Sequence, residues 1–411
     1  MKIVILVLLT FGFAQAQMET TAAATQAELT NADIRAQLSE LNEKIKTLEV
    51  SSEKNSAKSK VSFFGDLRLR QQHEKVSGFD ERRIQRLQVK LGAKIDFSEN
   101  LQATVRLMTG SGANSGNVTL GDNKSAANAR RGIGVDLAYV NYQPLEYLTF
   151  QAGKLPTPFY FVGKNQMLLD RDITPEGFAL KMPLEISEEW SFTILGLASW
   201  MVENYDSSAG LDETDSFFNG AQGYAKWKRG DTSVIAGLGT FSFTKVKNNE
   251  PKKFFGNSSD VTLNNSRGNT LVIDPLSGNN VYLYNYDLSE LFLEAKQKVG
   301  EWEFSVFQEI IENYNANIAN KSTALGATAQ YKKWSFSYID QKVERDSVFA
   351  LFTDSDFAGN FTASKGTILQ VGYKATKEAA FMLTQFDNKN DIDSTLEAKY
   401  KRMHLDFTLS F

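Results

Sequence analysis

The chain has 411 residues, a formal net charge of −4, no cysteine and two histidines. The lack of cysteine excludes disulfides and thiolate metal sites, and two histidines far apart in the sequence give no metal cluster. The mild charge gives no reason to expect a nucleic-acid partner, and we expect no cofactor.

Hydropathy narrows the fold class. Past residue 17 no segment approaches the roughly 18 apolar residues of a membrane-spanning helix. A transmembrane β-barrel remains open, because half of each barrel strand faces water. The 29 Phe, 14 Tyr and 5 Trp, with only 7 Pro, suit long strands that carry aromatic girdles.

Residues 1–16 have the pattern of an export signal. Lys2 supplies a positive charge, an apolar run follows from Ile3 to Phe13, and Ala14-Gln-Ala16 is a small-residue cleavage site. The run is too short to span a membrane, and the lack of a following cysteine excludes a lipoprotein signal. We expect the mature chain to begin near Gln17, with an uncleaved anchor as the alternative.

Residues 17–50 are predicted to form a periplasmic coiled-coil helix, joined by a polar linker at 51–60. Apolar residues recur at alternating steps of four and three, and Asn31 on this seam is of the type that fixes register. Such a short helix is marginal alone, so we expect it to associate. The alternative is a single helix on the barrel mouth, or one left half-formed. The seam comprises Ile34, Leu38, Leu41, Ile45 and Leu48.

Residues 61–411 predict an all-β fold, a transmembrane antiparallel barrel of about sixteen strands. Polar and apolar residues alternate with period two, as between Leu87 and Phe97, in segments long enough to cross a bilayer when tilted. The segments lie near 61–72, 84–97, 101–109, 133–143, 148–155, 178–186, 190–201, 217–228, 232–245, 289–299, 301–313, 322–333, 334–344, 366–375, 379–388 and 395–411.

The connections between these segments favour a barrel over a soluble sandwich. Seven are tight, and the eight between them are mostly long and polar, the longest being 246–288. This alternation is typical of a barrel with turns at one end and loops at the other. Both termini fall on the turn side, which is periplasmic. A barrel of about sixteen strands is too wide for side chains to fill and holds a water channel.

The residues from Met403 to Phe411 alternate apolar and polar up to the final ring. A barrel needs such a strand, because its last strand must pair with its first to leave no edge in lipid. We expect the barrel-assembly machinery to bind the chain through Phe411.

The connection after the fifth strand, residues 154–177, is apolar and aromatic although it lies on the loop side. Apolar side chains need a surface to cover, and the inner wall of the barrel offers one. We expect this loop to fold into the lumen and narrow it; capping the rim or a partner barrel are alternatives. The constriction residues are Pro156, Pro158, Phe159, Asp170, Arg171, Asp172, Glu176 and Gly177.

Basic residues gather on the polar faces of the first three strands, which point to the lumen because charge facing lipid is costly. Opposite acidic loop residues (Asp170, Asp172 and Glu176) they would produce a field that filters ions and orients dipolar solutes. Salt bridges that only brace the loop are the alternative, and both roles are compatible. The basic residues are Arg68, Arg70, Arg86, Lys90 and Arg106.

Two motifs carry a resemblance to a known family. Gly153-Lys-Leu-Pro-Thr-Pro-Phe159, then Asp170-Arg-Asp172 and Pro175-Glu-Gly177, are similar to the Gly-Lys/Arg…Pro-Phe and Asp…Glu-Gly pattern of the Putative porin family of Gram-negative outer membranes. The wider group includes general diffusion and phosphate-selective porins. The resemblance implies a homotrimer in a lipid and lipopolysaccharide membrane that passes small hydrophilic solutes and ions. The dense basic ladder of phosphate-selective members is only partly present.

Two other functions are weighed. A lipid hydrolase needs a serine and a general base on the lipid side. His404 is expected to point into the lumen and His73 to lie in a rim loop, so we expect no enzyme. A structural or adhesive protein that tethers the envelope through its coiled coil is the alternative function.

Overall fold

The computed structural model describes residues 39, 43–44, 46, 60–110, 115–122, 129–203, 215–255, 266–390 and 397–411. The chain divides into two units, Met1–Lys58 and Ser59–Phe411. In the first unit Ser39, Glu43, Lys44 and Lys46 are helical. The predicted signal peptide and the seam residues Ile34, Leu38, Leu41, Ile45 and Leu48 lie outside the described residues. No helix in the described ranges is both long and apolar enough to cross a membrane.

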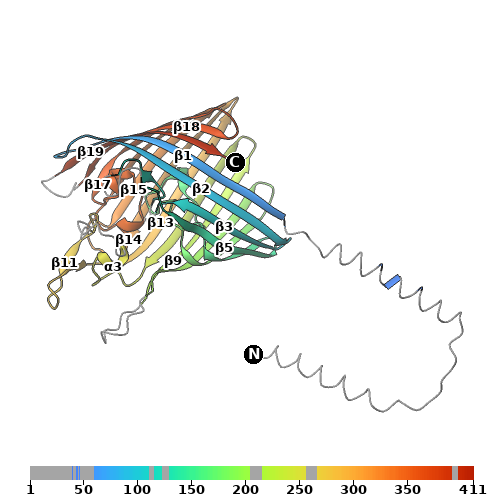
Figure 1. Cartoon of the computed structure of the whole chain (residues 1–411), viewed down its shortest axis with the longest axis horizontal. Helices are drawn as coiled ribbons and strands as arrows, with labels where there is room; N and C mark the ends of the chain where they lie inside the picture. Colours follow the sequence, from blue (N-terminus) through green and yellow to red (C-terminus); the bar gives the residue numbers. More distant parts are fainter. Residues whose placement is uncertain are drawn as a thin grey trace, which may run out of the picture. The chain divides into compact units, whose positions relative to one another are not determined.

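Sixteen long strands of the second unit's described residues close into an antiparallel β-barrel (Figure 1), which confirms the predicted fold class. These strands are β1 (Lys60–Val76), β2 (Arg82–Ser98), β3 (Leu101–Thr109), β5 (Ile133–Leu145), β6 (Leu148–Lys154), β7 (Glu176–Glu185), β8 (Trp190–Val202), β9 (Ser216–Arg229), β10 (Thr232–Phe243), β13 (Tyr286–Val299), β14 (Trp302–Asn313), β15 (Lys321–Tyr331), β16 (Trp334–Val343), β17 (Ser364–Lys374), β18 (Ala379–Asn390) and β19 (Ala398–Ser410).

Short elements lie in the longer connections, which leave the barrel strands at the loop end. The two-residue β4 (Val118–Thr119) pairs with β2, and β11 (Leu271–Ile273) pairs with β12 (Asn280–Tyr282) in a separate hairpin. The remaining short elements are the helix α3 (Lys252–Phe255) and the 3-10 turns η1 (Val162–Lys164), η4 (Ala350–Phe352) and η5 (Phe357–Gly359).

The alternation of side chains sets the register of each strand. In β14 the apolar Trp302, Phe304 and Val306 are exposed on the outside, while Phe307 and Glu309 are buried inside. A slip of one residue would turn the buried carboxylate outward and the apolar band inward. The outer face therefore suits lipid and the inner face carries the polar residues.

Aromatic rings mark both ends of the outer band. Near the turns, Trp302 stacks on Tyr331 with ring centroids 4.6 Å apart. At the loop end, Trp200 lies between Phe178 and Phe217, with centroids at 6.2 and 5.9 Å. Rings at two levels are typical of a barrel that meets two membrane interfaces.

The barrel closes between its first and last strands. β1 pairs with β19 from Asp66 opposite Ser410 to Val76 opposite Tyr400. Beyond this ladder Gly65 and Phe411 exchange two backbone hydrogen bonds of 3.1 Å. A Cβ at Gly65 would lie 2.7 Å from Cζ of Phe411, so glycine leaves room for the terminal ring.

Tight turns lie at the end of the barrel that holds both of its termini, as the alternation of connections predicts. The longer connections at the other end include residues 155–175, 244–285 and 344–363. Parts of all three pack inside the barrel in one apolar core, in which Phe243 contacts Phe349 and Phe352 with ring centroids at 5.5 and 5.1 Å. The loop half of the barrel is therefore partly filled.

A charge on the outer band should destabilise the barrel. Leu291 is 60 % exposed and lies between the outward Leu238 and Ile310. We expect Leu291→Arg to lower the free energy of unfolding in phospholipid vesicles by about 2–4 kcal/mol, because lipid solvates a guanidinium poorly. Leu291→Phe is the apolar control. Equal unfolding free energies for Leu291→Arg and the wild type, measured by denaturant titration, would show that this face does not meet lipid.

Candidate functional site: the loop-lined lumen

The loop that follows β6, residues 155–175, lies against the inner wall of the barrel. Its Leu155, Met167 and Leu169 are almost fully buried. The Phe159 ring packs edge-on against Phe241 of β10, with centroids 4.9 Å apart. These contacts remove apolar loop surface from water, which favours the inward position of the loop.

Polar contacts fix the loop to three strands of the wall. The Tyr160 amide donates to Oε1 of Gln222 at 2.8 Å, and Nε2 of Gln222 donates back to the Tyr160 carbonyl at 3.1 Å. The Tyr160 hydroxyl donates to Glu294, and Nδ2 of Asn165 donates to Oε2 of Glu309 at 2.8 Å. The buried wall groups thus have partners on the loop, as buried polar groups require.

The loop backbone lies close against the wall at Gly163. Its φ is +54°, and a Cβ there would lie 2.0 Å from Cδ1 of Phe307. Only glycine combines this left-handed conformation with so close a contact. The next residue, Lys164, is also left-handed, with φ of +64°.

A second loop, residues 344–363, meets the first inside the barrel. The Asp170 amide donates to the Phe352 carbonyl at 2.7 Å, and the Ser355 amide donates to Oδ2 of Asp170 at 3.1 Å. The Asp354 amide also donates to the Gln166 carbonyl at 3.2 Å. The inward position of this second loop was not expected from the sequence, although its apolar run from Val348 to Phe352 resembles the apolar pattern that predicts the inward position of the first loop.

The second loop is held by the basic wall. Asp356 accepts from Nη1 of Arg70 at 2.9 Å and from Nη1 of Arg402 at 2.9 Å. Arg70 also pairs with Asp406 at 2.6 Å, and Arg402 pairs with Glu74 at 2.7 Å. All of these groups are largely buried, so removing one partner would leave an uncompensated charge.

The other predicted basic residues have different partners. Lys90 contacts Asp172 of the first loop at 3.1 Å, and Nε of Arg106 lies 2.5 Å from Asp136 of β5. Nη2 of Arg68 donates to Asn117 at 2.8 Å. Among the described residues Arg86 has no ion-pair partner, and its buried Nε lacks a hydrogen-bond acceptor.

The predicted acidic residues are not gathered as one charged tip. Asp172 alone faces the predicted basic residues; Asp170 is buried and accepts from the Asp172 amide at 2.9 Å. Glu176 and Gly177 begin β7 instead of lying in the constriction. The 66 % exposed Glu176 pairs with Lys154 at 2.8 Å, and it has the outward phase of Phe178.

The two histidines are both on strands. His404 is 1 % exposed and lies inside the barrel, with its ring 5.5 Å from Phe386 and Nδ1 3.7 Å from Asp356. The expectation that His73 lies in a rim loop is wrong, because β1 continues past it to Val76. His73 contacts Glu81, which lies beyond the end of this strand.

The carboxyl groups where the two loops meet differ in their pKa values. Burial, and then the charge of Asp172, raises the pKa of Asp170 to about 7. Burial and the charge of Asp356 raise the pKa of Asp354. Burial opposes ionisation of Asp356 too, but Arg70 and the other cations around it lower its pKa below the ordinary value. The pKa values of the carboxyl groups at the loop contact are thus shifted in opposite directions.

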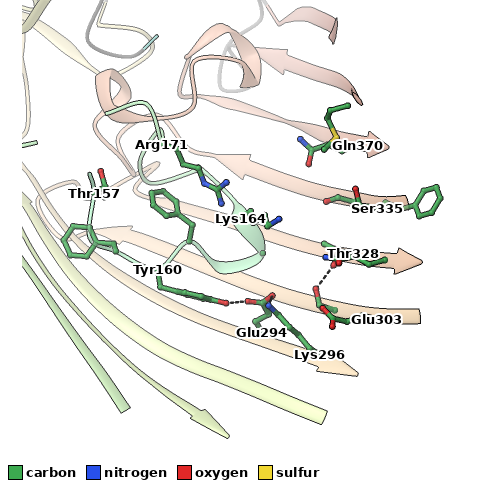
Figure 2. A pocket seen from close by; sticks show the side chains of 18 of the residues that line it. Thr157, Tyr160, Lys164, Arg171, Glu294, Lys296, Glu303, Thr328, Ser335 and Gln370 are labelled. Atoms are coloured by element: carbon green, nitrogen blue, oxygen red, sulfur yellow. Dashed lines mark hydrogen bonds and ion pairs between the residues drawn. The ribbon is translucent and has the colours of Figure 1, made fainter. Parts of the chain in front are cut away.

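Two adjoining cavities of about 570 and 490 Å³ open around the first loop. The larger lies toward the turns and is shown in Figure 2. The smaller borders the basic wall and both loops. The residues that line both are Pro156, Gly163, Lys164, Arg171, Gln370 and Met382.

A closed sixteen-stranded barrel with an apolar outer band, a polar lumen and an inward loop defines an outer-membrane porin-type protein. Residues 78–291, more than half of the chain, match the model of the Putative porin family, and the chain belongs to that family. The family resemblance of the sequence is thereby confirmed. No curated protein matches the sequence.

Three solved structures are similar to this chain at low sequence identity, and the first of them shares its fold. Pseudomonas putida OprB at high pH is 12 % identical over 85 % of this chain and 94 % of its own, with a TM-score of 0.53. Salmonella typhi OmpF in complex with daunomycin is 11 % identical over 86 % and 98 %, with a TM-score of 0.49. A loop-deletion mutant of Vibrio cholerae OmpT is 14 % identical over 86 % and 99 %, with a TM-score of 0.47.

A methyl group at Gly163 should displace the first loop from the wall. We expect Gly163→Ala to lower the unfolding free energy by about 1–3 kcal/mol more than Gly230→Ala, because it overpacks against Phe307. Gly230 is the matched control: its φ is +56°, but a Cβ there meets nothing within 4 Å. Equal losses for the two variants in denaturant titration would contradict the close packing of loop and wall.

The raised pKa of Asp170 predicts a pH-dependent stability. Between about pH 4 and pH 7 the folded protein keeps a proton on Asp170 that the unfolded chain releases. This group's contribution to stability therefore falls as the pH rises through that window, and Asp170→Asn should remove the fall. The test is the difference in unfolding free energy between wild type and variant from pH 4 to 8; a constant difference would contradict the prediction.

Proposed function

We propose that this outer-membrane protein forms a water-filled channel for passive diffusion of small hydrophilic solutes and ions, narrowed by the loop of residues 155–175. The observation that carries the proposal is the pair of adjoining cavities around a loop that glycine, aromatic and hydrogen-bond contacts pin to the inner wall. Pro156 and Arg171 line both cavities, and Phe159 lines the larger one and packs on Phe241 of the wall.

Selection by charge follows from the same contacts. Arg70 and Lys90 brace the two loops through Asp356 and Asp172, which supports the bracing role weighed for the basic residues. Arg68 has no carboxylate partner among the described residues and lines the smaller cavity. We infer that the wall keeps a positive surplus and favours anions.

We propose that the turns and the N-terminal helix of residues 17–50 face the periplasm, that the barrels associate as a homotrimer, and that Phe411 is bound by the barrel-assembly machinery. The Phe411 ring is 67 % exposed, which supports its availability to a partner. The buried position of His404 inside the barrel supports a protein without hydrolase activity at this residue, because its ring does not face lipid.

Conductance in a planar bilayer tests the channel. We expect purified protein to give stepwise, ohmic currents, and an electrically silent membrane would contradict the proposal. Replacing Arg68, Arg86 and Arg106 by Ala should move the reversal potential in a salt gradient toward cation selectivity, because three positive charges leave the wall. An unchanged reversal potential in this triple variant would leave the three arginines with a structural role.

A further inference from the structure

The charged residues that the first inward loop contributes to the larger cavity are both positive. Within residues 155–175, the exposed residues are Lys164 and Arg171. The acidic residues of the same loop are withdrawn, since Asp170 is buried and Asp172 is paired with Lys90. The chemistry that a passing solute meets on this loop is therefore that of an ammonium and a guanidinium.

The loop's own contacts fix the residues on either side of Lys164 and the side chain of Arg171. Lys164 lies between Gly163, pressed against Phe307, and Asn165, bonded to Glu309. The Arg171 amide donates to Oε1 of Gln166 at 2.8 Å. Its guanidinium lies over the Phe161 ring, 5.3 Å from the centroid, which restrains its direction.

The side chains of Lys164 and Arg171 point into the larger cavity (Figure 2). Neither forms an ion pair within the ranges that the structure describes. A preorganised pair of donors facing open space, without a carboxylate of its own, is suited to an oxyanion.

The facing wall of this cavity consists largely of neutral hydrogen-bonding groups. They are Ser305, Thr328, Gln330, Ser335, Ser337 and Gln370. The hydroxyls of Ser305 and Thr328 already contact each other at 2.8 Å. Such groups exchange hydrogen bonds with solute hydroxyls without a charge requirement.

The carboxylates of the cavity do not cancel the cations of the loop. Glu294 accepts from the Tyr160 hydroxyl and lies 3.0 Å from Nζ of Lys296, so its charge is already compensated. Glu303 follows Trp302 directly and lies at the turn end of the cavity. A solute entering this space meets positive charge on the loop and hydroxyl or amide groups on the wall.

We propose that this cavity is a binding site for a small hydroxylated organic anion, such as a sugar acid or sugar phosphate, and that Arg171 and Lys164 bind its oxyanion. The inference rests on the proposed channel function and names the solute class that the channel retains. The hydroxyl groups of the solute lie along the Ser/Thr/Gln wall. A volume of about 570 Å³ is in the range of small-molecule sites.

The test is block of chloride current by added solutes, with gluconate as the carboxylate probe and glucose 6-phosphate as the phosphate probe. Glucose lacks the anion and acetate lacks the hydroxyl groups. We expect gluconate or glucose 6-phosphate to half-block the wild type at a concentration at least about tenfold below that of glucose or acetate. The order of the two anions distinguishes a carboxylate site from a phosphate site.

Variants assign the effect to the loop. We expect Arg171→Gln and Lys164→Gln each to raise the half-blocking concentration of the preferred anion at least about tenfold. Gln370→Leu should narrow the difference between gluconate and acetate. Lys298→Gln is the matched control, because it removes a charge from the same face of β13 as Lys296 but lies outside the cavity lining.

Failure of this inference and failure of the channel give different results. A wild type that conducts but is blocked equally by gluconate, glucose and acetate overturns the binding site and leaves the channel. Equal block of Arg171→Gln, Lys164→Gln and Lys298→Gln also overturns it. If the protein does not conduct, calorimetric titration of the detergent-solubilised full chain with the same four solutes decides, and the absence of anion-specific heat overturns the site.

Discussion

The structure depends on the pairing of the first strand with the last. Backbone amides and carbonyls that face lipid have no water to bind, so a sheet survives there only when its two edges pair. The ladder between β1 and β19 and the reciprocal bonds of Gly65 with Phe411 provide that pairing. With sixteen strands the closed wall encloses more space than its inward side chains fill. The two inward loops occupy part of this space.

The two inward loops are held inside the barrel by different interactions. The first is held mainly by burial of apolar and aromatic groups, with Phe159 on Phe241 and Gly163 on Phe307. The second is tied to the wall by the charge of Asp356 between Arg70 and Arg402. In the first loop Asp170 is buried and Asp172 is paired with Lys90, so the charges that this loop exposes are those of Lys164 and Arg171.

Period-two alternation, together with the alternating short and long connections, predicts every barrel strand to within a few residues, because one face of each strand must be apolar. The sequence pattern predicts Glu176 in the loop after the fifth strand, whereas the structure has it as the first residue of β7. Its outward charge, paired with Lys154, interrupts the apolar pattern at the start of that strand. The contact of Asp170 with Ser355 joins residues far apart in the chain, and no local pattern encodes it. The burial of Asp170 and the exposure of Arg171, its neighbour, likewise depend on that tertiary contact.

The most direct test of the inward loop uses the absence of cysteine from the chain. A Lys164→Cys variant presents a single thiol, so a bulky neutral methanethiosulfonate reagent can react nowhere else. The account predicts a stepwise fall in the current of each open channel as the thiol at position 164 is modified. Complete modification, verified by mass, with no change in single-channel current would contradict a loop that lies in the path of the solute.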